Sequence, residues 1–319
     1  MATRYFLVDA KYIALAQLVA FAKINLGRVI FPSGSEPMRK NHNPELTAAY
    51  WTIAGRFPGA EPEYSRFGFK ERVQAAARAG FCGLGIWHAD LEQILQQQTL
   101  QEMKLVLAAN GVKYLEVEFL VDWFMDGELK AHSDLRKKKL MIAGEALGAT
   151  QIKVGDFYQR KCSLPQICDA FAALCREAAE HGTRVAFEPM AVSMINSLED
   201  CRAMIEGSGA ANGGVILDLW HVANLGIAYE EVARWPAKYL YGVEIADGSF
   251  DSSSGPAKKP IVDRRFCGEG EFDIDGFIRA VHKTGYTGPW GVEIFSQTLA
   301  SKPLDELARR AFNTAMSQF

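Results

Sequence analysis

The chain has 319 residues, of which 49% are hydrophobic and 11% aromatic, and its formal charge is −3. This is an ordinary globular composition, and the length suits one large α/β barrel or two smaller domains. The mild acidity argues against nucleic acid or an anionic membrane as a general partner, because both would require a basic surface.

Residues 1–47 are expected to form an N-terminal extension that covers part of the domain or contributes to an oligomer interface. Within it, the segment Tyr12–Phe31 is strongly apolar, but Asp9 precedes it and Lys23 and Arg28 interrupt it. Such a segment does not predict a membrane span. With this extension as a contact, we expect a homo-oligomer.

From residue 48 onward, short apolar runs typical of β-strands alternate with helical patterns that have one polar face. Eight apolar runs are present, at Ala49–Gly55, Gly83–Trp87, Tyr114–Phe119, Gln151–Gly155, Arg184–Glu188, Gly214–Asp218, Tyr239–Ile245 and Trp290–Ile294. The clearest helical patterns lie at Lys70–Ala79, Leu135–Ala146, Leu164–Glu180 and Glu230–Arg234. Several of the helical segments end at a glycine, which is the usual stop signal.

Eight strands that alternate with helices, at a spacing of roughly 30 residues, predict a closed (β/α)8 TIM barrel over residues 48–319. A doubly wound open sheet is the alternative. That fold would need a glycine-rich phosphate-binding turn after its first strand, and the segment Gly55–Gly59 does not match one.

Acidic residues stand at the carboxyl ends of four consecutive predicted strands: Glu188, Asp218, Glu244 and Glu293. In a barrel these ends meet at one mouth, where the chemistry of such folds takes place. Carboxylates brought so close together repel one another unless a cation lies among them. Oxygen ligands favour a hard divalent ion such as Mn²⁺ or Mg²⁺. The alternative is that each carboxylate is solvated separately.

The same residues belong to longer motifs that resemble a known family. In chain order these are Phe-Glu188-Pro, Leu-Asp218-Leu-Trp-His221, Val-Glu244-Ile-Ala-Asp247-Gly, Cys-Gly268-Glu-Gly270 and Gly-Tyr286-Thr-Gly-Pro-Trp-Gly-Val-Glu293. From about Ala49 to its C-terminus the chain resembles the xylose isomerase-like sugar isomerase and epimerase superfamily. That group includes inosose isomerases and dehydratases, ketose 3-epimerases and 3-dehydroshikimate dehydratases.

The resemblance implies that Glu188, Asp218, Glu244 and Glu293 ligate one divalent metal, most simply Mn²⁺, with Mg²⁺ or Co²⁺ as alternatives. It also implies that Glu188 and Glu293 are the catalytic pair, which faces a sugar-like substrate from opposite sides and moves a proton through an enediolate. Two departures from the family stand out. The seventh-strand ligand of the family is usually His, and here it is Glu244. The stretch Met190–Ile195 is apolar, whereas ketose 3-epimerases carry another acidic residue there.

Five further residues are candidates for substrate binding. By the resemblance, His221 and Arg265 contact substrate, although His221 could instead orient a neighbouring ligand. Lys153 lies within the fourth strand and points either into the mouth or outward between helices. Glu118 lies near the carboxyl end of the third strand. His88 follows the second strand, with a bystander role beside a helix cap as the alternative.

The predicted function is a cytoplasmic, metal-dependent isomerase or epimerase that abstracts a proton next to a carbonyl of a sugar or sugar-like polyol. The alternative is a lyase or dehydratase that uses the same acid–base pair to eliminate from a 3-oxo-sugar or 3-oxo-glycoside, and the apolar segment Met190–Ile195 favours it. A third hypothesis is a non-catalytic barrel subunit of a hetero-complex. The six cysteines contain no Cys-x-x-Cys pair and are expected to be reduced thiols.

Overall fold

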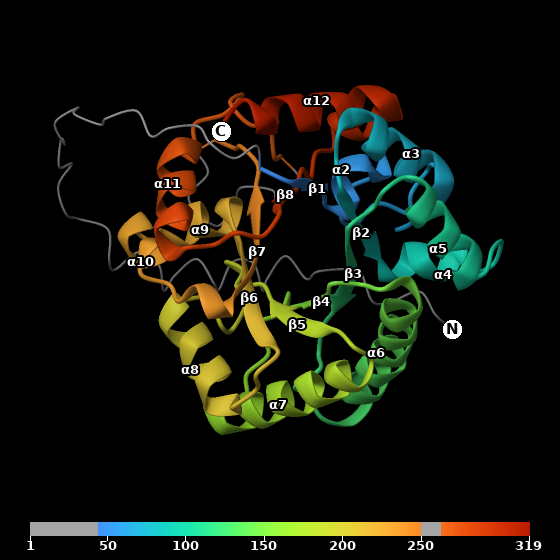
Figure 1. Ribbon diagram of the computed structural model, residues 1–319. Helices are drawn as coiled ribbons and strands as arrows, with labels where there is room; N and C mark the ends of the chain where they lie inside the picture. Colours follow the sequence, from blue (N-terminus) through green and yellow to red (C-terminus); the bar gives the residue numbers. More distant parts are fainter. Residues whose placement is uncertain (1–43, 250–262) are drawn as a thin grey trace, which may run out of the picture.

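The computed structural model describes residues 44–249 and 263–319, and these form a closed barrel of parallel strands surrounded by helices (Figure 1). The strands follow one another around the barrel in chain order, and the first pairs with the last. They are Leu46–Ala48 (β1), Gly83–Trp87 (β2), Tyr114–Leu120 (β3), Gln151–Val154 (β4), Arg184–Phe187 (β5), Gly213–Asp218 (β6), Leu240–Ile245 (β7) and Trp290–Val292 (β8). The predicted (β/α)8 barrel is confirmed.

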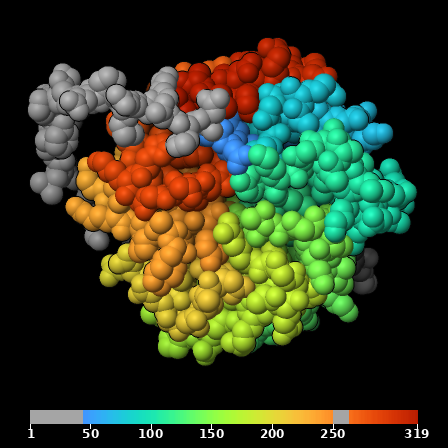
Figure 2. All heavy atoms as spheres, in the orientation of Figure 1, coloured from blue at the N-terminus to red at the C-terminus, as the bar shows by residue number. Residues whose placement is uncertain are grey.

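Helices cover the outer face of the barrel. They are Tyr50–Ala54 (α2), Phe69–Ala79 (α3), His88–Ile94 (α4), Leu100–Ala109 (α5), Gly127–Leu147 (α6), Leu164–Glu180 (α7), Leu198–Ser208 (α8), Leu219–Leu225 (α9), Tyr229–Ala233 (α10), Ile274–Thr284 (α11) and Leu304–Met316 (α12), with 3-10 turns at Ala237–Tyr239 and Leu299–Ser301. Local chemistry sets their ends: Thr99 and Glu102 form a capping box on α5, and Gly148 ends α6 in the left-handed region. The C-terminal helix α12 packs against α2 and α3, so the chain closes the barrel beside its first strand (Figures 1 and 2).

The first strand is the main error of the sequence-based assignment. The sequence predicts it at Ala49–Gly55, whereas β1 is Leu46–Ala48 and the next five residues form α2. All of α2 is buried, so strand and helix read as one apolar run, which periodicity alone does not divide. The barrel therefore begins at Leu46, inside the predicted extension 1–47; the proposed cover or oligomer contact of residues 1–43 lies outside the described residues.

A second apolar cluster lies apart from the main core, at the carboxyl ends of the strands. We call it the mouth cluster; it consists of Tyr50, Trp51, Ala54, Trp87, Phe119, Val121, Met190 and Phe295, with Ala89 and Phe157 packed against it. Its rings are in contact, with centroids 5.1 Å apart for Trp51 and Trp87 and 4.8 Å apart for Phe119 and Phe157. Aromatic side chains thus line the end of the barrel where the acidic residues lie. Within the described residues, no helix has the length and apolar character needed to cross a membrane.

Candidate active site

Four carboxylates meet at the carboxyl end of the barrel. Glu188 directly follows β5 and Glu293 directly follows β8, while Asp218 and Glu244 are register partners on β6 and β7. One oxygen from each of the four lies within 4.8 Å of the others, and all four side chains are buried. We call this group the carboxylate cluster. The structure therefore brings together the four residues that the sequence predicts as metal ligands.

Lys153 points into the barrel mouth and contacts the carboxylate cluster. Its Nζ lies 2.7 Å from Glu244 Oε2, 2.9 Å from Glu293 Oε1 and 3.3 Å from Glu188 Oε2. Burial by itself would lower the pKa of this amine, but the surrounding carboxylates raise that pKa well above its usual range. The side chain is therefore an ammonium ion surrounded by anionic groups.

Arg264 is the second cation of the cluster. Its Nη1 lies 2.8 Å from Asp218 Oδ2 and 2.9 Å from Glu293 Oε2, and it also donates to the main-chain oxygen of Glu293. The guanidinium lies over the ring of Phe295, 4.1 Å from its centroid. This arginine is fully buried, and no sequence signal separated it from its neighbour.

The structure places Arg264, rather than the predicted Arg265, in the cluster. The main chain of Arg265 pairs with Asp247 as an antiparallel bridge, and its side chain lies against the main-chain oxygen of Glu269. Successive side chains of an extended segment point to opposite sides, so only one of two adjacent arginines can face the mouth. Asp247 itself accepts hydrogen bonds from the main-chain N–H groups of Gly268 and Phe272, which holds this loop against the barrel.

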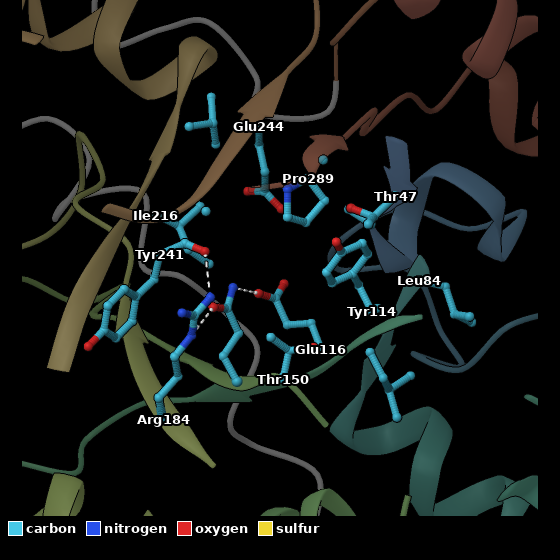
Figure 3. Close-up of a pocket in the computed structure, with 17 residues that line it drawn as sticks. Thr47, Leu84, Tyr114, Glu116, Thr150, Arg184, Ile216, Tyr241, Glu244 and Pro289 are labelled. Atoms are coloured by element: carbon cyan, nitrogen blue, oxygen red, sulfur yellow. Dashed lines mark hydrogen bonds between the residues drawn. The ribbon is translucent and has the colours of Figure 1, made fainter. Parts of the chain in front are cut away.

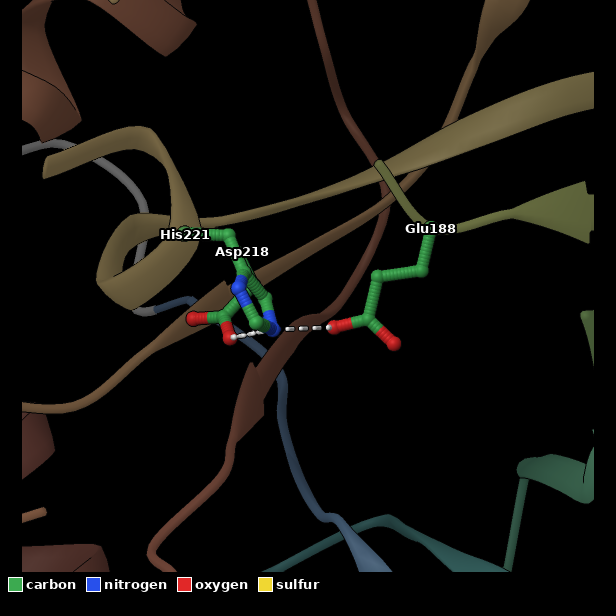
Figure 4. A group of neighbouring side chains, drawn as sticks. All are labelled: Glu188, Asp218 and His221. Carbon is green, nitrogen blue, oxygen red and sulfur yellow. Dashed lines mark ion pairs between the residues drawn. The ribbon is translucent and has the colours of Figure 1, made fainter. Parts of the chain in front are cut away.

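His221 lies between two carboxylates of the cluster, as Figure 4 shows. Its Nε2 is 3.6 Å from Glu188 Oε1 and 3.7 Å from Asp218 Oδ2. Asp218 also caps α9 by accepting the N–H of Trp220, and this turn positions the imidazole three residues later. Burial, and then the positive charge of Arg264, lower the pKa of His221 well below its usual range, so the ring is neutral.

Burial also changes the protonation of the carboxylates. It raises the pKa of Glu188 to about 8, an effect that Lys153 partly offsets and Glu293 reinforces. The pKa values of Glu118 and Glu244 are likewise raised, again mainly by burial. A carboxyl group with a pKa near neutrality is suited to exchange a proton during a reaction.

Of the remaining two candidates, Glu118 lies beside Lys153 and His88 packs on the mouth cluster. Glu118 is buried, with Oε2 3.8 Å from Lys153 Nζ and Oε1 without a hydrogen-bond partner. A Cβ on Gly85 would lie 2.5 Å from that Oε1, so the absence of a side chain there leaves room for the carboxylate. His88 begins α4 and packs on Trp87 of the mouth cluster, and its Nδ1 is buried without a partner. Burial, and then two nearby cations, lower its pKa to about 3.

These residues fit a divalent metal ion. Within residues 44–249 and 263–319, five buried carboxyl groups, those of the cluster and Glu118, face two buried cations, Lys153 and Arg264. Asp218 Oδ2 is buried and forms an ion pair with Arg264 Nη1 at 2.8 Å, whereas Glu118 Oε1 is buried without a hydrogen-bond partner. An all-oxygen donor set with excess negative charge suits a hard cation.

A polar group that the sequence did not single out occupies the opposite end of the barrel. It surrounds a cavity of about 50 Å³ that also reaches Glu244 (Figure 3). Gln151 donates to Glu116 Oε2 at 2.7 Å, and Arg184 donates to Gln151 Oε1 and to the main-chain oxygen of Tyr241. Because these residues lie at the amino ends of the strands, where barrels carry structural rather than catalytic residues, we interpret the group as a stabilising network.

Comparison with known proteins agrees with the fold. The family model described as a xylose isomerase-like TIM barrel matches residues 73–315. A 3-dehydroshikimate dehydratase of Pseudomonas aeruginosa is 26% identical over 73% of this chain, and an inosose isomerase of Halalkalibacterium halodurans is 21% identical over 71% of it. The match covers 37% of the dehydratase and 82% of the isomerase, so the chain spans well under half of the former.

Solved structures share the same architecture at low sequence identity. The structure described as the IOLI protein with a bound zinc atom has a TM-score of 0.75 and 19% identity, covering 86% of this chain and 97% of the other. A D-allulose 3-epimerase from Methylomonas sp., solved with D-allulose, has a TM-score of 0.66 and 18% identity, covering 87% and 98%. Likeness at this level establishes the fold.

Proposed function

Because the chain belongs to the xylose isomerase-like TIM barrel family, we propose that it is a metal-dependent enzyme that isomerises or epimerises a sugar or sugar-like polyol. The observation that carries this proposal is the meeting of four buried carboxylates at the barrel mouth, two of which, Glu188 and Asp218, contact a neutral imidazole. The known proteins that this chain matches include an inosose isomerase and 3-dehydroshikimate dehydratases.

Glu188, Asp218, Glu244 and Glu293 would hold the metal ion, whose chemistry would be to polarise the carbonyl and hydroxyl oxygens of the substrate. We propose Mn²⁺, with Mg²⁺ or Co²⁺ as alternatives, because every donor is a carboxylate oxygen. Glu244 also adds a negative charge to the ligand set, at the position where the family usually has a His. A neighbouring structure is described with zinc, so Zn²⁺ belongs in the same test.

The chain's own proton chemistry rests on Glu188 and Glu293. One carboxylate removes the proton from the carbon next to the substrate carbonyl, and the enediolate that forms takes a proton back from the other. In the metal-free protein burial raises the pKa of Glu188 to about 8, and a bound cation would lower that pKa and favour the carboxylate form, which removes a proton. Lys153 and Arg264 both contact Glu293, and they would stabilise negative charge that develops beside it.

Substrate contacts are proposed from side chains that reach the mouth. We propose His221, Lys153, Glu118 and Arg264 as groups that bind substrate oxygens, with Arg264 in the role first expected for Arg265. We retain His88 as a contact at the rim, because its buried Nδ1 lacks a partner and it packs on the mouth cluster.

The mouth cluster favours a second candidate function, elimination from a 3-oxo-sugar or 3-oxo-glycoside by the same carboxylate pair. Its aromatic rings suit an apolar or planar leaving group better than a free polyol. Met190 belongs to this cluster, in agreement with the apolar stretch noted in the sequence.

Metal analysis and proton exchange test the proposal. The protein, stripped with chelator and reloaded with Mn²⁺, Mg²⁺, Co²⁺ or Zn²⁺, would be incubated in D₂O with ketoses, inososes and 3-oxo-glycosides. Deuterium uptake next to the carbonyl without elimination would support the isomerase, whereas release of an aglycone would support the lyase. Glu188→Gln should abolish exchange, and Glu116→Gln, which changes a half-buried carboxylate at the opposite barrel end, is the control. Exchange that needs no ion, or that survives Glu188→Gln, would refute the site; a chain inert with every substrate would favour the non-catalytic subunit.

The quaternary structure is a separate proposal. We propose a homo-oligomer, and light scattering of the purified chain during gel filtration would measure its mass directly.

A further inference from the structure

Lys153 occupies an unusual place for a substrate-binding lysine, because its ammonium group lies among the proposed metal ligands themselves. Its Nζ is within 3.3 Å of oxygens from Glu188, Glu244 and Glu293, three of the four carboxylates of the cluster. The side chain is 1% exposed, so these contacts are shielded from water. A divalent ion bound by the same oxygens would lie close to this positive charge, and like charges in a buried site repel strongly.

We propose that Lys153 is a tethered cation that competes with the divalent metal for Glu188, Glu244 and Glu293 and thereby sets the metal affinity of the site. This inference rests on the proposed metal-dependent function. In the metal-free protein the ammonium compensates the carboxylates and keeps them together. Part of the binding free energy of the metal is therefore spent on separating Lys153 from its partners.

Glu118 provides the place to which the displaced ammonium can move. Its Oε2 lies 3.8 Å from Lys153 Nζ, and its Oε1 is buried without a hydrogen-bond partner. Glu118 and Lys153 are register partners on β3 and β4, so a change in the lysine side-chain rotamer brings the two groups together without moving the barrel. Gly85, which has no side chain, leaves room for the Glu118 carboxylate itself.

Arg264 is not expected to compete in the same way. Its guanidinium is held by Asp218, by both the carboxylate and the main-chain oxygen of Glu293, and by the ring of Phe295. A planar group with several fixed contacts resists displacement, whereas lysine carries a single charge on a flexible stem. Lys153 is therefore the cation that yields to the metal.

The test is a calorimetric titration of chelator-stripped protein with Mn²⁺, for the wild type and for Lys153→Met. The variant should bind Mn²⁺ about tenfold more tightly or better, the equivalent of about 1.4 kcal/mol. Without metal it should melt at a lower temperature than the wild type, and Mn²⁺ should raise its melting temperature by more. Lys137→Met is the matched control, because Lys137 also contacts two carboxylates, Asp134 and Glu177, but on the outer helices. Its Mn²⁺ affinity should equal that of the wild type.

Glu118→Gln gives an independent measurement if Lys153→Met does not fold without metal. Removing the charge that receives the ammonium should weaken Mn²⁺ binding, and combining it with Lys153→Met should abolish that effect. Mn²⁺ binding by Lys153→Met that is equal to or weaker than wild type would overturn the inference, as would a Glu118→Gln effect that persists in the double variant.

The outcomes separate the inference from the proposed function. Mn²⁺-dependent proton exchange by the wild type, together with unchanged affinity in Lys153→Met, would refute the inference alone. Tighter Mn²⁺ binding by Lys153→Met, together with a metal-loaded wild-type protein that turns over no sugar, would support the inference and refute the proposed function. A wild-type protein and a variant that both fail to bind any divalent ion would overturn both.

Discussion

Replacing Glu188 by Gln should change how the stability of the metal-free protein depends on pH. The Glu188 side chain is 3% exposed, and its oxygens lie 3.3 Å from Lys153 and 3.6 Å from His221. Burial raises its pKa from 4.5 to about 8. Between these two values the folded protein keeps a proton that the unfolded chain has lost. The contribution of this proton to the free energy of unfolding is therefore fully present below pH 4.5, and it is lost as the pH rises from 4.5 through about 8.

The size of the effect follows from that pKa. Raising the pKa from 4.5 to about 8 corresponds to at most roughly 5 kcal/mol, at about 1.36 kcal/mol for each pH unit. Neighbouring carboxylates share the protons, so we expect a single substitution to recover roughly half of this, about 2 to 3 kcal/mol. Gln has the same shape and no charge, so Glu188→Gln should lose less stability than the wild type between about pH 5 and about pH 8.5.

Urea unfolding in the presence of chelator measures this difference. The free energy of unfolding of Glu188→Gln minus that of the wild type should increase by about 2 to 3 kcal/mol from about pH 5 to about pH 8.5. Glu128→Gln, which removes an exposed carboxylate at the start of α6, is the control and should show no such trend. A Glu188→Gln difference that stays constant with pH would show that the buried carboxyl group titrates normally and would refute the reasoning. With Mn²⁺ present the wild type should have the higher free energy of unfolding of the two proteins, because it binds the ion more tightly than the variant does.

Three further experiments test individual charged groups. Asp218→Asn keeps the helix cap but removes a proposed ligand, so calorimetry should show Mn²⁺ affinity reduced by about a hundredfold while circular dichroism stays unchanged, and full retention of affinity would contradict the assignment. Arg264→Met should lower kcat/KM by about a hundredfold, whereas Arg265→Met should change it less than about threefold; equal losses would contradict the placement of Arg264 alone in the cluster. Arg72→Met removes the partner of buried Asp90 and should cost about 3 to 5 kcal/mol in urea unfolding, and adding Asp90→Asn should recover part of that loss.

The repeated strand and helix pattern and the acidic residues at the strand ends were readable from the chain alone. Both depend on local features: apolar runs, glycine stops and the position of a carboxylate relative to the end of a run. In a closed parallel barrel all carboxyl ends point the same way, so Glu188, Asp218, Glu244 and Glu293 had to lie at one mouth once eight strands were counted. That is why the proposed ligand set came from sequence and its convergence was predicted.

The direction of individual side chains was decided only by the tertiary structure. Lys153 faces the mouth because its register on β4 places it opposite Glu118, and this register depends on pairing between strands far apart in sequence. The choice between Arg264 and Arg265 depends on a bridge to Asp247 across the loop. The split between β1 and α2 and the assembly of the mouth cluster likewise depend on burial against distant residues. The sequence thus determined that four carboxylates reach the mouth, and long-range packing determined which cations join them there.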